Sequence, residues 1–350
     1  MKMNTLGRTD IDVSAICLGT MTWGVNSQND EAEAHRQLSR AVEAGVNFID
    51  TAEMYPTTPH SKEGQGSTEK FIGTWLKDQK REDLVVATKI AGEGSRYIRD
   101  GAPISPEAID DALHTSLKSL QTDYVDLYQL HWPNRGSYCF RQNWDYTPSN
   151  QPPTAQVEDE MRAILESLKG YVKEGKIRHI GLSNETAWGT MRWLQLAKEL
   201  DAPRMESIQN EYSLLARLYD TDLAEMTAHE DVGLLAYSPL AAGLLTGKYA
   251  GGAIPKGARA DVGSKTLGGR MTDRVHDAVA AYQAIADKHG LDLVQMSLAF
   301  CMQRPFVTST IIGATSGEQL ETCLGAADVT LSEEVLDEIN TTHKQHPMPY

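Results

Sequence analysis

Residues 84–89, Leu-Val-Val-Ala-Thr-Lys, form a short apolar and β-branched run that ends in a charged residue. Such a run is typical of a buried strand in a parallel sheet. Seven further runs of this kind occur, separated by longer segments with helical spacing, at residues 15–19, 47–52, 124–132, 179–183, 207–212, 233–239 and 309–313. Eight repeated βα units favour a closed (β/α)8 barrel, the TIM-barrel fold, over an open doubly wound sheet.

The helices are expected between these strands, and several begin with Ser, Thr or Asp and an acidic first turn, as helix N-caps favour. They are residues 30–44, 68–77, 106–120, 158–174, 187–200, 219–229, 275–288 and 318–326, with residues 333–343 trailing. Residues 1–13, in which Leu-Gly-Arg-Thr-Asp separates two β-like pieces, predict an N-terminal hairpin ahead of the first strand. Three connections that follow strands are longer than simple links, namely residues 91–105, 133–157 and 241–272. We expect them on the carboxyl-terminal face, where barrel sites are built.

Composition indicates one large domain, residues 1–350, with 41% hydrophobic residues for its core. A polar start and the lack of any apolar run of about 18 residues predict a cytoplasmic protein with no membrane partner. The formal net charge of −15 disfavours nucleic acid. Four cysteines without CxxC spacing predict neither a metal site nor a disulfide framework; they are Cys17, Cys139, Cys301 and Cys323.

The segment 247–274 reverses this charge, with six basic residues against two acidic ones. A cationic segment in an anionic protein suggests an anionic ligand, and a solvated surface loop is the alternative interpretation.

Four reactive side chains stand at or just after consecutive strand ends: Asp50, Tyr55, Lys89 and His131. Strand ends that are adjacent in a barrel are neighbours in space, so an ammonium near the phenol would lower its pKa from the usual value near 10. Asp50 could hold Lys89, and His131 could bind a carbonyl oxygen. This set suits proton delivery to an oxygen that gains charge as hydride arrives, without a metal. The alternative is a structural ion pair, a packing tyrosine and a core histidine.

Familiar cofactor motifs are absent from the sequence. It has no GxGxxG opening a helix, no GxxxxGK[ST] and no HExxH, so a nicotinamide cofactor must bind by another route than the open-sheet fingerprint.

Three segments resemble the aldo-keto reductases, and the resemblance extends over nearly the whole chain. They are residues 47–55 (NFIDTAEMY), 87–89 (ATK) and 126–132 (DLYQLHW). Residues 19–24 and 52–56 and the long loop after His131 are similar to the Tas-type bacterial members. The resemblance implies NADPH-dependent reduction of small carbonyl compounds, with Tyr55 as proton donor, Lys89 and Asp50 tuning it, and His131 orienting the carbonyl.

The resemblance also implies an extended NADPH/NADP+ site. Ser183, Asn184 and Gln209 would clamp the nicotinamide, and residues 243–248 with Arg259 would fold over the phosphates, as in relatives of the potassium-channel β-subunit type. The full set of cofactor residues is Gly19, Thr20, Met21, Asp50, Ser183, Asn184, Gln209, Tyr237, Ser238, Pro239, Leu240, Gly243, Lys248, Arg259, Gly313, Thr315, Gln319 and Cys323. The chain departs from the family at Thr322-Cys323, where Glu-Asn often reads the adenine edge.

The substrate pocket is predicted to contain Trp23, Tyr55, His131 and Trp132, because aromatic side chains next to strand ends can wall an apolar pocket. Further aromatic residues lie in the loop after His131, namely Tyr138, Phe140, Trp144 and Tyr146. Two other functions stay open at this stage: a cofactor-sensing regulatory subunit with weak or vestigial reductase activity, and a barrel with unrelated chemistry such as an isomerase. The sequence does not identify the substrate or the oligomeric state, and a homo-oligomer is among the states it allows.

Overall fold

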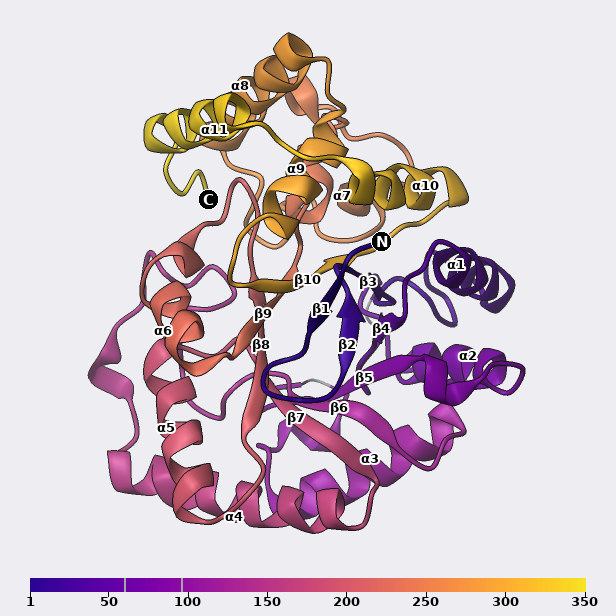
Figure 1. Ribbon diagram of the computed structural model, residues 1–350, viewed down its shortest axis with the longest axis vertical. Helices are drawn as coiled ribbons and strands as arrows, with labels where there is room; N and C mark the ends of the chain where they lie inside the picture. Colours follow the sequence, from indigo (N-terminus) through magenta and orange to yellow (C-terminus); the bar gives the residue numbers. More distant parts are fainter. Residues whose placement is uncertain (60, 96) are drawn as a thin grey trace.

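Eight parallel strands close into a barrel in the computed structural model, which describes residues 1–59, 61–95 and 97–350 (Figure 1). The strands pair in chain order, and the last strand pairs with both the seventh and the first, which closes the sheet. Each predicted run overlaps one of them: β3 Ile16–Gly19, β4 Phe48–Asp50, β5 Val85–Ile90, β6 Val125–Leu130, β7 Ile177–Ser183, β8 Met205–Glu211, β9 Gly233–Tyr237 and β10 Val307–Ile312. The predicted (β/α)8 barrel is confirmed.

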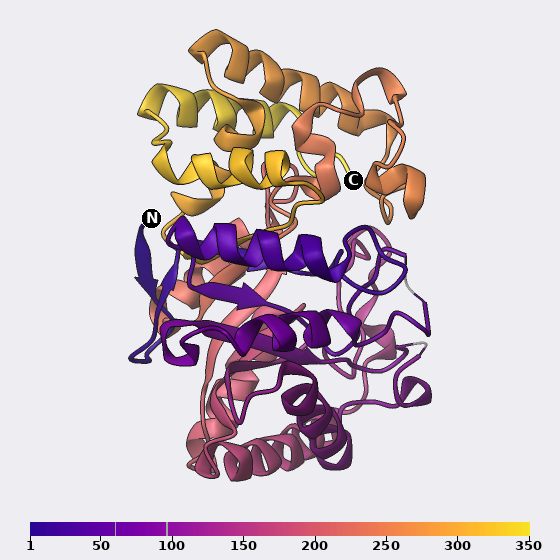
Figure 2. The same cartoon turned by 90° about the vertical axis from the view of Figure 1, so that its right-hand side faces the viewer.

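Helices surround the barrel (Figure 2). Those that follow or precede its strands are α1 Glu31–Glu43, α2 Ser67–Leu76, α3 Pro106–Leu120, α4 Thr154–Lys173, α5 Ala187–Glu199, α6 Asp222–Glu230, α9 Leu293–Met302 and α10 Gly317–Gly325. Several are capped as the sequence predicts, since Asp30, Ser105 and Ser316 each accept a hydrogen bond from a backbone N–H in the first turn. No described helix is both long and apolar enough to cross a membrane.

The connections contain short helical segments. These are the four-residue α7 Arg259–Val262 and the 3₁₀ turns Arg81–Asp83, Arg99–Gly101, Pro148–Asn150, Leu218–Asp220, Ala241–Thr246, Ala250–Gly252 and Ala326–Asp328.

Helix α9 is absent from the sequence prediction, which places one helix between β9 and β10. Its sequence, LVQMSLAFCM, is apolar on nearly every side, and most of its residues are buried. A helix without a polar face lacks the 3.6-residue periodicity that identifies a surface helix. α9 packs on β10 and α10, while α8 Asp273–His289 pairs with α11 Glu333–Gln345 outside it (Figure 1).

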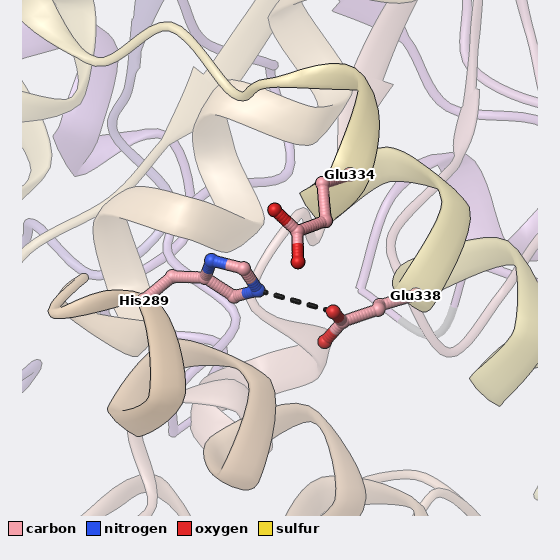
Figure 3. Close-up of side chains that lie close together, drawn as sticks. All are labelled: His289, Glu334 and Glu338. Atoms are coloured by element: carbon pink, nitrogen blue, oxygen red, sulfur yellow. Dashed lines mark hydrogen bonds and ion pairs between the residues drawn. The ribbon is translucent and has the colours of Figure 1, made fainter.

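An ion-pair cluster joins α8 to α11. His289 Nε2 lies 3.2 Å from Glu338 Oε1, and Glu334 lies beside them (Figure 3). The same Glu338 oxygen also lies 2.5 Å from the Lys288 ammonium nitrogen. Because this cation already accompanies the carboxylate, we interpret the group as an interhelical ion pair and not as a metal site.

The N-terminal hairpin, β1 Met3–Thr5 and β2 Asp12–Ser14, is also confirmed. Its apolar residues Leu6 and Val13 share one buried cluster with Phe48 and Val85, which stand at the starts of β4 and β5. The hairpin therefore covers the amino-terminal end of the barrel and leaves the carboxyl-terminal end for the site.

Candidate active site

A cavity of about 860 Å³ lies at the carboxyl-terminal ends of the strands. Two of the three long connections, residues 133–157 and 241–272, contribute to its wall. All of the predicted cofactor residues line it: Gly19, Thr20, Met21, Asp50, Ser183, Asn184, Gln209, Tyr237, Ser238, Pro239, Leu240, Gly243, Lys248, Arg259, Gly313, Thr315, Gln319 and Cys323. The tertiary structure thus brings together residues that are as much as 300 positions apart in sequence.

The four predicted reactive side chains meet at the base of this cavity. Lys89 on β5 is fully buried, and its Nζ lies 2.6 Å from Asp50 Oδ2 and 3.4 Å from the Tyr55 hydroxyl oxygen. Its third donor bond, of 2.8 Å, goes to the backbone carbonyl of Thr51. The rings of Tyr55 and His131 meet edge to face, with centroids 5.9 Å apart. Asp50, Tyr55 and His131 line the cavity, and Lys89 lies behind them.

Two glutamines hold the Asp50 carboxylate. Gln129 and Gln209 donate to Asp50 Oδ1 over 3.1 and 2.9 Å, and Gln209 also donates to Gln129 Oε1. A buried carboxylate needs such donors because burial without partners is costly. Sequence reasoning assigned Gln209 to the cofactor and missed Gln129, although a polar residue within the apolar strand β6 was a usable signal.

Burial dominates the electrostatics of the site. It raises the pKa of Tyr55 above 10, and the Lys89 ammonium opposes this rise without reversing it. The Lys89 ammonium lowers the tyrosine pKa as the sequence predicts, but desolvation of the phenolate outweighs this effect, so the net shift is upward. Burial and then the Lys89 charge lower the pKa of His131 well below 6.5, so its imidazole is neutral at pH 7.

Asn184 and its neighbours form a rigid polar wall. Asn184 adopts a left-handed backbone conformation, with φ of 52°, that costs energy for a non-glycine residue. Its Nδ2 donates to the His131 carbonyl over 2.9 Å, and its Oδ1 accepts from the Tyr237 hydroxyl over 2.7 Å. Ser183 Oγ donates to the Gln209 carbonyl over 2.9 Å. These bonds fix the side chains of Ser183 and Asn184, and the bonds to Asp50 and Gln129 fix that of Gln209.

Two cations in the cavity wall lack an acidic partner. Neither Lys248 nor Arg259 forms a side-chain hydrogen bond or ion pair with the described part of the chain. Burial lowers the pKa of both, and that of Arg259 falls to about 10, partly because Arg270 repels it. Half-buried cations without counterions fit an anionic ligand, and phosphate groups of a dinucleotide would supply the missing charge. Lys256, which the sequence reasoning did not assign, also lines this region.

Trp23 is a correction to the predicted substrate pocket. Its side chain is fully buried in the main hydrophobic core and does not line the cavity. A turn after Thr20, with a bridge between Trp23 and Asn29, directs the ring into the protein. Trp132 does line the cavity, with its ring centroid 4.9 Å from that of His131.

Of the loop aromatics, Phe140 also reaches the cavity. Its ring lies edge to face with that of Trp132, with centroids 6.0 Å apart. Trp144 and Tyr146 are exposed and do not line the cavity, and Tyr138 lines a separate space of about 60 Å³.

The far end of the cavity contains the Thr322-Cys323 pair. Burial raises the pKa of the Cys323 thiol to about 12, so this group is neutral and offers a small apolar surface. Gln319 Oε1 accepts hydrogen bonds of 3.1 Å from both the backbone and the hydroxyl of Thr315. This end therefore lacks the carboxylate and amide pair that the family often carries there.

A closed parallel barrel with a buried lysine between a carboxylate and a tyrosine at its carboxyl-terminal end defines a barrel oxidoreductase. The chain belongs to the aldo/keto reductase family, whose model matches residues 15–344. It is 46% identical over 357 aligned residues to Protein tas of Escherichia coli (strain K12), covering 100% of this chain and 99% of that protein.

Two relatives with lower identity are named as proteins of different function. The chain is 31% identical to the NADH-specific methylglyoxal reductase of Escherichia coli (strain K12), covering 95% of each protein. It is also 31% identical to a probable voltage-gated potassium channel subunit beta of Oryza sativa subsp. japonica, covering 99% of this chain and 98% of that protein. The family establishes an oxidoreductase that acts on small carbonyl compounds with a nicotinamide cofactor.

Proposed function

We propose that the protein reduces aldehydes and ketones to alcohols, with NADPH as hydride donor and Tyr55 as proton donor. The observation that carries this proposal is the 3.4 Å separation between Lys89 Nζ and the Tyr55 hydroxyl oxygen in the cavity wall. When bound, the reduced nicotinamide supplies the hydride that the carbonyl carbon accepts.

The chain's own residues would then handle the proton. The Tyr55 hydroxyl is protonated at neutral pH, and burial raises its pKa further; it donates its proton to the carbonyl oxygen as that oxygen gains charge. Lys89 stabilises the resulting phenolate, and Asp50 holds Lys89 in position. His131 has a neutral ring, and its buried Nδ1 has no hydrogen-bond partner among the described residues. This imidazole would orient the carbonyl.

Cofactor binding would divide between two sets of residues. Ser183, Asn184 and Gln209, which line the cavity, would bind the nicotinamide amide, and Lys248 and Arg259 would pair with phosphates. Two unpaired cations support NADPH, which carries one more phosphate than NADH. One relative is named as NADH-specific, so titration of both cofactors is the direct measurement.

The Tyr55→Phe variant tests the proposal. We expect kcat for NADPH-dependent aldehyde reduction to fall by about 100-fold or more, while NADPH still changes its fluorescence on binding. Tyr146→Phe is the matched control, because Tyr146 is exposed and outside the cavity. Unchanged turnover in Tyr55→Phe would contradict the assignment.

A cofactor-sensing regulatory subunit is the second candidate, supported by the similarity to relatives named as potassium channel subunits. It predicts turnover close to background and a stable partner in pull-down experiments, whereas the reductase predicts catalysis by the isolated chain. A cytoplasmic location, a single domain over residues 1–350 and a homo-oligomer remain predictions from the sequence.

A further inference from the structure

Arg141, in the connection 133–157, lines the cavity and also the separate space of about 60 Å³ next to it. Its Nε donates to the Gly268 carbonyl, and its Nη1 lies 3.0 Å from Glu211 Oε2. Its Nη2 makes no hydrogen bond within residues 1–59, 61–95 and 97–350. Two N–H groups of a cation are therefore available beside the cavity.

The backbone holds Arg141 in this place at an energetic cost. Phe140 and Arg141 are consecutive non-glycine residues with left-handed φ angles of 57° and 65°. Such conformations persist where surrounding contacts impose them, and they are frequent at binding sites. Gly268, with φ of 67°, leaves room for the guanidinium, because a Cβ there would lie 3.2 Å from Arg141 Nη2. Two separate segments of the chain thus accommodate this one side chain.

The charge around Arg141 is not balanced. Glu211 also accepts a hydrogen bond of 2.8 Å from Arg270, so one carboxylate forms ion pairs with two guanidinium groups. No other carboxylate of the described chain forms an ion pair with either arginine. The group of Arg141, Arg270 and Glu211 therefore has a net charge of about +1 and attracts an anion.

Arg141 belongs to a different connection from the cations assigned to the cofactor, although its charge helps to lower the pKa of Arg259. Its neighbour in sequence, Phe140, lies against Trp132, and the Trp132 ring lies against His131. The rings of His131, Trp132 and Phe140 therefore form a continuous row, and Arg141 comes directly after Phe140 in the chain. Lys248 and Arg259 belong to the connection 241–272, which also supplies Gly268 and Arg270 beside Arg141.

We propose that Arg141 binds a carboxylate of the substrate, so that the preferred substrates are aldehydes or ketones that carry a carboxylate across an apolar spacer. The carbonyl would lie at Tyr55 and His131, and the spacer would lie against Trp132 and Phe140. This inference rests on the proposed reductase function.

The test compares 4-formylbenzoate with its neutral methyl ester as substrates for NADPH oxidation. We expect Arg141→Gln to lower kcat/KM for the anion about tenfold or more, and to change kcat/KM for the ester by less than about twofold. Arg141→Lys, which keeps the charge, should retain part of the preference. Arg162→Gln removes an exposed charge that pairs with Glu199 far from the cavity, and it should leave the ratio between the two substrates unchanged.

If Arg141 only holds Gly268 and Glu211 in place, Arg141→Gln should change kcat/KM by the same factor for both substrates. An anion-to-ester ratio that is the same in the parent and in Arg141→Gln would overturn this inference and leave the reductase function intact. Failure of the parent protein to oxidise NADPH with either aldehyde would instead overturn the reductase function, and this inference with it. Benzoate gives a second readout, since it should inhibit reduction of the ester competitively in the parent and at least about tenfold more weakly in Arg141→Gln.

Discussion

The ammonium nitrogen of Lys89 lies 3.4 Å from the hydroxyl oxygen of Tyr55, and both side chains are buried. The two residues come from different βα units, and the pairing of β4 with β5 brings them together. Although burial lowers the pKa of Lys89, the Asp50 carboxylate and Tyr55 raise it overall. Lys89 is therefore a permanent cation beside the phenol at neutral pH.

Replacement of Lys89 by Met should lower kcat by about 100-fold, because the developing phenolate loses its counterion. The substitution also leaves the buried Asp50 carboxylate unpaired, which costs about 3–5 kcal/mol of stability. The double variant Asp50→Asn/Lys89→Met is the control, because it removes both charges. It should recover stability in urea unfolding and stay inactive; recovered activity would contradict a role for the ammonium.

Removal of Arg259 should weaken the binding of NADPH more than that of NADH. We expect Arg259→Ala to raise the Kd for NADPH by about tenfold or more in fluorescence titrations, because a charge-assisted hydrogen bond is lost. The same titrations on Lys248→Ala identify the cation that contacts the extra phosphate, because its loss should raise the Kd for NADPH more than the Kd for NADH. An equal loss for both cofactors would place Arg259 at the pyrophosphate that they share.

The two predicted pocket tryptophans should behave differently. Trp23→Ala should lower the free energy of unfolding by about 3–5 kcal/mol, because it empties a fully buried core position. Trp132→Ala, at the cavity wall, should mainly raise KM for aromatic aldehydes. Urea unfolding and steady-state kinetics on both variants check this contrast. A stable Trp23→Ala with altered KM would restore Trp23 to the pocket.

Glu69 should make stability depend on pH. Its side chain is buried on α2 and accepts from the Thr88 hydroxyl over 2.6 Å. Burial raises its pKa from 4.5 to about 7, and the Thr88 bond opposes this rise. Since the folded protein binds this proton more tightly than the unfolded chain, the contribution to stability is full below about pH 4.5 and is lost as pH rises through 7.

The Glu69→Gln variant measures this effect. It should remove up to about 3 kcal/mol of the decrease in unfolding free energy between pH 5 and pH 8. Glutamine keeps the oxygen that Thr88 contacts, so cavity effects are small. If the parent and the variant show parallel pH profiles in urea unfolding, Glu69 does not hold the proton.

The barrel and the four reactive residues were predictable because their signals are local in the sequence. Each barrel strand overlaps a short apolar run of five to nine residues, and the four reactive residues stand at or just after the ends of three consecutive runs. The buried helix α9 escaped the prediction because it has no polar face. The polar side chain of Gln129 in β6 was a signal of a buried polar partner, but the sequence did not reveal that this partner is Asp50.

The sequence by itself determined the order of the eight strands, the identity of Asp50, Tyr55, Lys89 and His131, and the excess of cations in residues 247–274. These properties depend on side-chain type and spacing along the chain. Only the tertiary structure decided the net direction of the Tyr55 pKa, the burial of Trp23 and the place of Arg141 beside Phe140. Desolvation, packing and charge balance depend on which distant residues surround a group, and the closing of the barrel sets those neighbours.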